Sequence, residues 1–189
     1  ANAADALVVI QGDTLIQESY WNGMDPHRQH IWYSMTKSLV SSVAGILIES
    51  GQLDLTKTPA DYIPELQGSA FDRVTVQQVM DHTSGLAFEE NYVEPKSDFS
   101  LYYAPALNLG YLPGAADLQP GAISIYCVYD FLTQFLKPDL DPPPGHLFDY
   151  NPANADVLEL IVSRLMDKSL AVVIRDALRL LRAAERAAV

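Results

Sequence analysis

The stretch Tyr33-Ser34-Met35-Thr36-Lys37-Ser38 places a serine and a lysine three residues apart. A serine hydroxyl is a poor nucleophile unless a neighbouring base removes its proton. On a helix, residues at this spacing share one face, with Cβ atoms about 5–6 Å apart. Lys37 can therefore activate Ser34 where its surroundings favour the neutral amine. The spacing predicts a nucleophile–base pair, and an N-cap serine followed by a solvated lysine is the alternative.

A long helix is expected to start at this pair. Residues 39–48 carry apolar side chains at steps of three and four, which is the pattern of a helix packed on one face. Gly51 follows, and glycine commonly ends helices in the left-handed conformation. The free N–H groups and positive dipole potential at the helix start suit the negative charge that develops on an attacked carbonyl.

Other elements follow from local pattern. Residues 6–10 and 14–21 favour strands, and the Gly-Asp turn between them predicts a hairpin. Thr75 and Gln78 form a capping box for a short helix to about Asp81. Residues 87–147 are irregular except for a helical pattern over 123–136, and two helical runs, 154–166 and 170–188, close the chain.

Four motifs, taken in order, resemble the serine β-lactamase-like and penicillin-binding-protein-like hydrolases, in their class C and esterase branch. The similarity runs from about Leu7 to about Ser169, and within the superfamily it is greatest to 6-aminohexanoate-dimer hydrolase-like proteins. The motifs are Tyr33-Ser34-Met35-Thr36-Lys37-Ser38, Gly51-Gln52-Leu53-Asp54, Asp81-His82-Thr83-Ser84-Gly85-Leu86 and Pro144-Gly145-His146-Leu147-Phe148-Asp149-Tyr150-Asn151.

The resemblance implies a catalytic set of Ser34, Lys37 and Tyr150. In this family the tyrosine of a Tyr-x-Asn or Tyr-x-Ser motif lies beside the nucleophile and passes a proton to the leaving group. Pro152 stands at the third position of that motif here, so the polar group expected there is missing or supplied from elsewhere.

The resemblance also implies a mixed α+β, β-lactamase/transpeptidase-like fold, with an N-terminal hairpin belonging to a sheet that is incomplete. We expect one domain over residues 1–189, in which 1–33 and about 167–189 form the sheet side. Residues from about 34 to 166 then supply the nucleophile helix and a mostly helical lobe.

Histidine and tyrosine offer further candidates. The family makes the His82-Thr83-Ser84-Gly85 turn structural, so a general-base role for His82 is not expected. His27, His30 and His146 lie in loops, and the single cysteine, Cys127, leaves no compact ligand set, so neither a metal nor another cofactor is expected. Four tyrosines can wall a substrate site or pack at the surface: Tyr92, Tyr102, Tyr103 and Tyr111.

Composition narrows the classes of partner. The net charge of −12 argues against nucleic acid and against an anionic membrane. No window reaches the roughly 18 apolar residues of a membrane span. We expect a soluble chain acting on a small ester or amide, with its compartment left open.

The family's third motif, Lys-Thr-Gly or His-x-Gly on a late strand, has no counterpart after Tyr150, because residues 151–189 contain no glycine. That strand normally donates the second N–H of the oxyanion hole. The chain is then a shortened fragment, a natural remnant, or a protein that self-associates or uses a partner to complete its sheet. The expected function is a serine hydrolase with an acyl-enzyme: a carboxylesterase, 6-aminohexanoate-oligomer amidase or β-lactamase-like enzyme. The alternative is a catalytically impaired homologue that acts as a binding or scaffold module.

Overall fold

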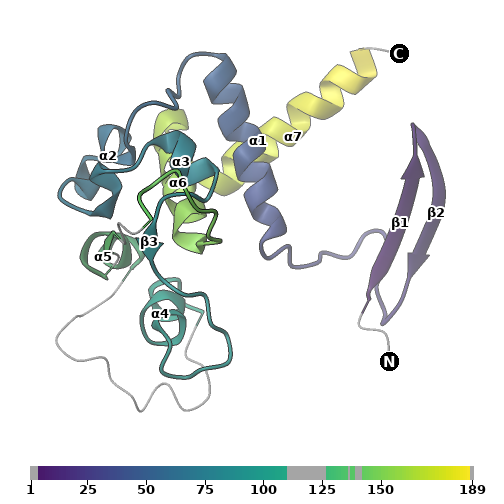
Figure 1. Cartoon of the computed structure of the whole chain (residues 1–189). Helices are drawn as coiled ribbons and strands as arrows, with labels where there is room; N and C mark the ends of the chain where they lie inside the picture. The colour runs from purple at the N-terminus through teal and green to yellow at the C-terminus, as the bar shows by residue number, and fades with distance from the viewer. Residues whose placement is uncertain (1–3, 110–126, 136, 139–141, 188–189) are drawn as a thin grey trace. The chain divides into compact units, whose positions relative to one another are not determined.

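The chain contains both helices and strands and divides into two compact units, Ala1–Met35 and Thr36–Val189 (Figure 1). The computed structural model describes residues 4–109, 127–135, 137–138 and 142–187. The division into sheet side and helical lobe within one domain stays a prediction.

The first unit holds the predicted hairpin. Strands β1 (Ala6–Gln11) and β2 (Thr14–Tyr20) pair antiparallel, with an irregular register between Val9 and Ile10. Gly12 has a φ of 57°, a left-handed value that glycine adopts without a Cβ clash. The hairpin prediction is therefore confirmed. Its apolar side chains are largely exposed: Leu7, Val8, Val9, Ile10, Leu15 and Ile16.

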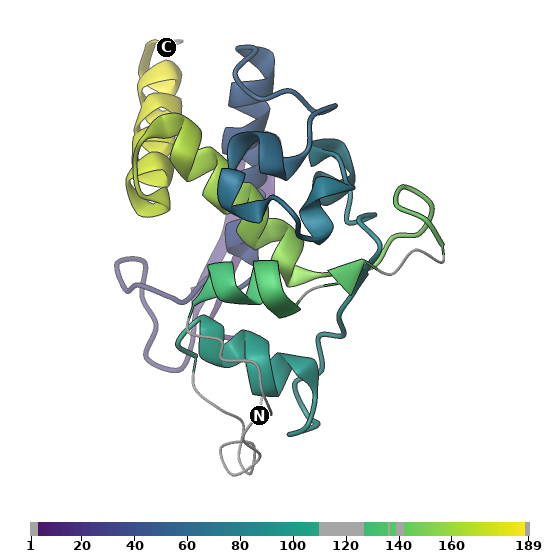
Figure 2. The same ribbon diagram turned by 90° about the vertical axis from the view of Figure 1, so that its left-hand side faces the viewer.

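The second unit is built around four helices. They are α1 (Met35–Glu49), α3 (Val76–Met80), α6 (Pro152–Met166) and α7 (Leu170–Ala187). Figure 2 shows α6 running through the middle of this unit, where it contacts α3 and α7. The predicted periodicity of the first helix is confirmed, because its buried residues recur at steps of three and four: Val40, Val43, Ala44 and Leu47.

Short elements complete the second unit. The α-helical ones are α2 (Pro59–Tyr62), α4 (Ala104–Ala106) and α5 (Val128–Asp130). The 3₁₀ turns are η1 (Pro64–Leu66) and η2 (Ala70–Asp72), and the π-helical turns are η3 (Phe99–Tyr103) and η4 (Phe131–Phe135). The helix predicted over 123–136 is thus found as α5 and η4, and its remaining residues, apart from Cys127, lie outside the described part.

A second, very small sheet was not predicted. Strands β3 (Leu86–Ala87) and β4 (Lys137–Pro138) pair antiparallel. Two-residue strands carry too little alternation to be recognised in a sequence. No helix in the described part of the chain is long and apolar enough to cross a membrane.

Local signals set the helix ends. The Thr75 hydroxyl accepts the Gln78 N–H and the Gln78 side chain accepts the Thr75 N–H, which confirms the capping box at α3. Gly51 ends α1 with a φ of 72°, and its N–H donates to the Ile48 carbonyl at 2.9 Å.

Two adjacent residues of α1 provide a matched test of this packing. Leu47 is 2% exposed and Ile46 is 55% exposed. We expect Leu47→Ala to lower the free energy of unfolding by about 2–5 kcal/mol, because it removes buried methyl groups and leaves a cavity. Ile46→Ala should change it by no more than about 0.5 kcal/mol. Urea unfolding followed by circular dichroism measures both, and equal losses would contradict this orientation of α1.

Candidate active site

The start of α1 carries two of the three predicted site residues. Ser34 is the last residue before the helix, and Lys37 lies in its first turn. The Met35 N–H donates to the Trp32 carbonyl at 3.0 Å, so a tight turn leads into the helix. Tyr33 has a φ of 43°, an unusual value for a bulky residue. Backbone strain of this kind is common at functional sites, so the conformation of Tyr33 is a second reason to examine Ser34 as a nucleophile.

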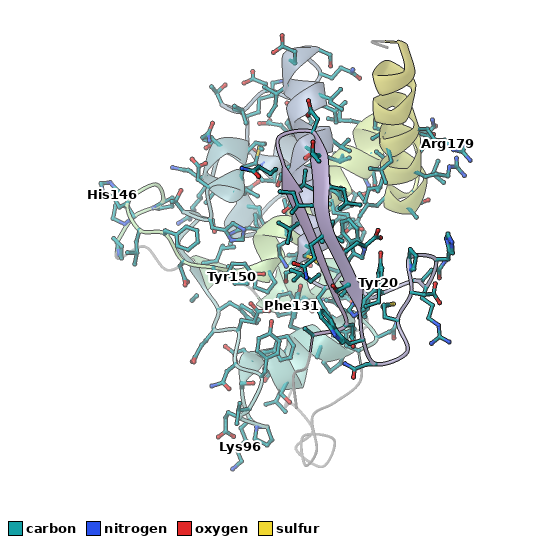
Figure 3. All side chains as sticks on the ribbon, turned by 90° about the vertical axis from the view of Figure 1, so that its right-hand side faces the viewer. Tyr20, Lys96, Phe131, His146, Tyr150 and Arg179 are labelled. Carbon is teal, nitrogen blue, oxygen red and sulfur yellow. The ribbon has the colours of Figure 1, made fainter. Side chains whose placement is uncertain are left out.

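Lys37 and Tyr150 are brought together by the fold of the second unit. The Lys37 Nζ lies 5.3 Å from the centroid of the Tyr150 ring, within the range of a cation–π contact. Tyr150 lies on the segment that enters α6 (Figure 3). Its side chain is 38% exposed, so the phenol is accessible to a small molecule. The base and the proton shuttle predicted from the sequence are therefore neighbours.

His82 contacts the same tyrosine from the turn after α3. The two rings stack, with centroids 5.2 Å apart and planes 4° apart. The Asp149 N–H donates to the His82 carbonyl at 2.8 Å, and the Asn151 N–H donates to His82 Nδ1 at 3.1 Å. The structural role expected for this turn includes direct support of Tyr150, which the sequence did not predict.

A partly buried carboxyl adds charge to this region. Burial raises the pKa of Asp156 to about 7, and a hydrogen bond from the Tyr103 hydroxyl at 2.7 Å opposes that rise. The positive charge of Lys37 also lowers the pKa of Asp156. Asp156 is one of the charges acting on the lysine, and sequence reasoning missed it. Its position one turn into the helix after Tyr150 was the only available signal.

Pro152 fits its position as the first residue of α6. Proline suits this position because an N–H there would have no acceptor within the helix, and because the φ of proline is already helical. Asn151 caps the helix, since its side chain accepts the Ala153 N–H at 3.0 Å. The buried Asn154 side chain has no hydrogen-bond partner in the described part of the chain. Asn154 therefore makes no hydrogen bond in place of the polar side chain that Pro152 lacks.

The remaining tyrosine candidates differ in burial. Tyr103 is buried and packs against Phe88 and Phe131, so it belongs to the core. Tyr92 is exposed and its hydroxyl donates to Glu90, whereas Tyr111 lies outside the described residues. Among the described residues, no group of three or more His, Cys, Asp or Glu side chains is placed to hold a metal ion.

Comparison with known proteins identifies the family. The Beta-lactamase family model matches residues 2–181, so the chain belongs to that family. It is 34% identical over 161 residues to the 6-aminohexanoate-dimer hydrolase of Paenarthrobacter ureafaciens, which covers 85% of this chain and 38% of that protein. The resemblance inferred from the sequence motifs is thereby confirmed.

Solved structures agree on the fold. A Bacillus anthracis protein provisionally described as a 6-aminohexanoate-dimer hydrolase matches with a TM-score of 0.67 and 29% identity, over 88% of this chain and 41% of that one. The D-amino acid amidase of Ochrobactrum anthropi SV3 matches with a TM-score of 0.54 and 20% identity, over 93% of this chain and 48% of that one. The predicted α+β, β-lactamase/transpeptidase-like fold is confirmed. The chain spans less than half the length of each of these relatives.

The carboxyl of Asp156 predicts a pH-dependent stability. Its folded-state pKa of about 7 lies above the ordinary value of 3.8, so the folded chain holds this proton more tightly and loses stability as pH rises between those values. Asp156→Asn should therefore gain stability relative to the unmodified chain from pH 4 to 7, by at most about 1.4 kcal/mol per pH unit.

Urea unfolding across this pH range measures the effect. Asp13→Asn, in the exposed hairpin turn, is the control and should keep the slope of the unmodified chain. Parallel stability curves for Asp156→Asn and the unmodified chain would contradict a buried, protonated Asp156.

Proposed function

We propose that the chain is a serine hydrolase that acts through an acyl-enzyme on a small ester or amide. The observation that carries the proposal is the contact of Lys37 with Tyr150, 5.3 Å from Nζ to ring centroid, on the helix that begins directly after Ser34. Acyl transfer to serine uses a serine hydroxyl, a base that takes its proton and an acid that protonates the leaving group, and Ser34, Lys37 and Tyr150 offer these three functions. Membership of the Beta-lactamase family supports the same reaction class.

The residues take complementary roles in acylation. The Ser34 hydroxyl oxygen attacks the carbonyl carbon of the substrate, and its proton passes to the Lys37 amine. The resulting tetrahedral oxyanion is stabilised by backbone N–H groups at the start of α1. The bond to the leaving group then breaks. The Tyr150 hydroxyl gives that group its proton and regains one from the Lys37 ammonium.

Deacylation reverses these proton transfers. Water attacks the ester carbonyl of the acyl-enzyme and gives up one proton to the Tyr150–Lys37 pair. The bond between the acyl carbon and the Ser34 oxygen breaks, the serine oxygen takes that proton back, and the carboxylic acid is released. One molecule of water is consumed for each ester or amide hydrolysed.

Short amides and carboxylesters are the proposed substrates, ahead of β-lactams. The two relatives with the highest identities reported above carry the name 6-aminohexanoate-dimer hydrolase. Linear 6-aminohexanoate oligomers are therefore the first amides to assay.

A binding or scaffold module is the second candidate function. Its support is the set of exposed apolar side chains on the hairpin of β1 and β2. Such a module would associate with itself or with another protein through the exposed apolar hairpin, β1 and β2.

Covalent labelling separates the two candidates. We expect a fluorophosphonate to modify Ser34 in the folded chain, because its hydroxyl is activated by Lys37. Intact-mass and peptide mass spectrometry locate the adduct. Ser34→Ala should abolish labelling. Ser41→Ala changes an exposed serine on α1 and should label at the rate of the unmodified chain. Folded chain that remains unmodified at Ser34 would support the scaffold alternative and contradict the hydrolase.

A further inference from the structure

The backbone of His82 is in the left-handed conformation, which few residues other than glycine adopt. Helix α3 ends at Met80, and His82 follows with a φ of 53°. Glycine usually fills this left-handed position after a helix, because a Cβ atom there meets the following carbonyl. The turn is held by the Thr83 N–H, which donates to the Gln78 carbonyl at 2.9 Å. Because His82 takes this position next to a candidate site, its side chain is a candidate for a function there.

The contacts of His82 fall on Tyr150 and its neighbours in the chain. Its carbonyl accepts the N–H of Asp149 and its Nδ1 accepts the N–H of Asn151, so the residues before and after Tyr150 are both bound, and its ring also lies 5.9 Å from that of Phe148. Its ring also lies parallel to the Tyr150 ring, 4° between planes. Two hydrogen bonds and one stacked ring fix the position, direction and plane of the tyrosine. No glycine at position 82 could supply the second bond or the ring.

The hydrogen bond from Asn151 also defines the protonation state of the imidazole. A nitrogen that accepts an N–H cannot carry a proton, so Nδ1 is bare and the neutral ring holds its proton on Nε2. Burial lowers the pKa of His82, the charge of Lys37 lowers it further, and Asp149 raises it. Lys37 lies on α1 and Asp149 is next to Tyr150. Because the pKa of His82 is lowered overall, the neutral imidazole that the hydrogen bond from Asn151 requires is favoured.

We propose that His82 is a positioning residue for Tyr150, which clamps the tyrosine through its carbonyl, its unprotonated Nδ1 and its ring. The catalytic consequence rests on the proposed function, in which Tyr150 gives a proton to the leaving group. Protonation of Nδ1 turns the acceptor into a donor facing the Asn151 N–H. The clamp therefore opens as pH falls below the ordinary histidine value of 6.5.

Amide and ester substrates respond differently to a displaced Tyr150. An amine leaving group needs a proton as its bond to carbon breaks, whereas p-nitrophenolate leaves without one. Displacement of the Tyr150 side chain should thus lower kcat for the linear 6-aminohexanoate dimer by about 10- to 100-fold. It should change the rate of the p-nitrophenolate burst, which reports acylation by p-nitrophenyl acetate alone, and the KM for the amide much less.

Two variants and one reference test this difference. His82→Gly keeps the left-handed backbone and the carbonyl acceptor but removes the side chain, and should show the full amide-specific loss. His82→Asn keeps a side-chain oxygen near the position of Nδ1 and should recover part of it. In the Tyr150→Phe background, His82→Gly should add no further loss of amide turnover. Equal losses in amide kcat and in the p-nitrophenolate burst rate, or losses that multiply with Tyr150→Phe, would overturn the positioning role.

Nitrogen-15 NMR of the unmodified 189-residue chain tests the clamp without any activity. At pH 8 we expect His82 with a bare Nδ1 and a protonated Nε2, and an Asn151 amide resonance that shifts as His82 titrates. A protonated Nδ1 at pH 8, or an Asn151 amide resonance that does not shift as His82 titrates, would overturn the proposal. Failure of the proposed function has a different signature, namely the expected NMR result together with no amide turnover and no adduct at Ser34.

Discussion

The placement of Lys37 against Tyr150 is the interaction on which the account of this protein depends. It joins the first turn of α1 to the segment that begins α6, two parts of the chain that are far apart in sequence. A lysine ammonium over a phenol ring is held by the ring's electron-rich face, and this contact keeps the proposed base next to the proposed proton donor. The helical core that packs α1 and α6 into one unit therefore also brings together two of the three residues proposed for catalysis.

Buried and partly buried polar groups surround this contact. Asp156 supplies a titratable carboxyl from α6, and its hydrogen bond with Tyr103 ties it to the aromatic core. His82 supplies a neutral ring and two acceptors from the turn after α3. The environment of the lysine is thus set by three separate elements, each fixed by its own local cap or turn. An arrangement of this kind is specific because few alternative packings satisfy all of these bonds at once.

The sequence predicted those features that depend on neighbouring residues. Three such features depend only on residues close together in the sequence: the Gly12 turn, the apolar stripe of α1 that ends at Gly51, and the Thr75–Gln78 capping box. The identity of Lys37 and Tyr150 as partners came from the order of the family motifs, and their contact in the fold agrees with it. Features created by distant residues were not predictable: the β3–β4 pair, the Asp156–Tyr103 hydrogen bond, and the support of Tyr150 by His82.

A crystal structure of the chain after reaction with a fluorophosphonate tests the central claim most directly. We expect phosphorus bonded to the Ser34 oxygen, with the Lys37 amine and the Tyr150 hydroxyl within hydrogen-bonding distance of that oxygen. We also expect the Ser34 N–H and one further backbone N–H to be directed at a phosphoryl oxygen. An adduct on another residue, or a Tyr150 hydroxyl turned away from the Ser34 oxygen, would contradict it.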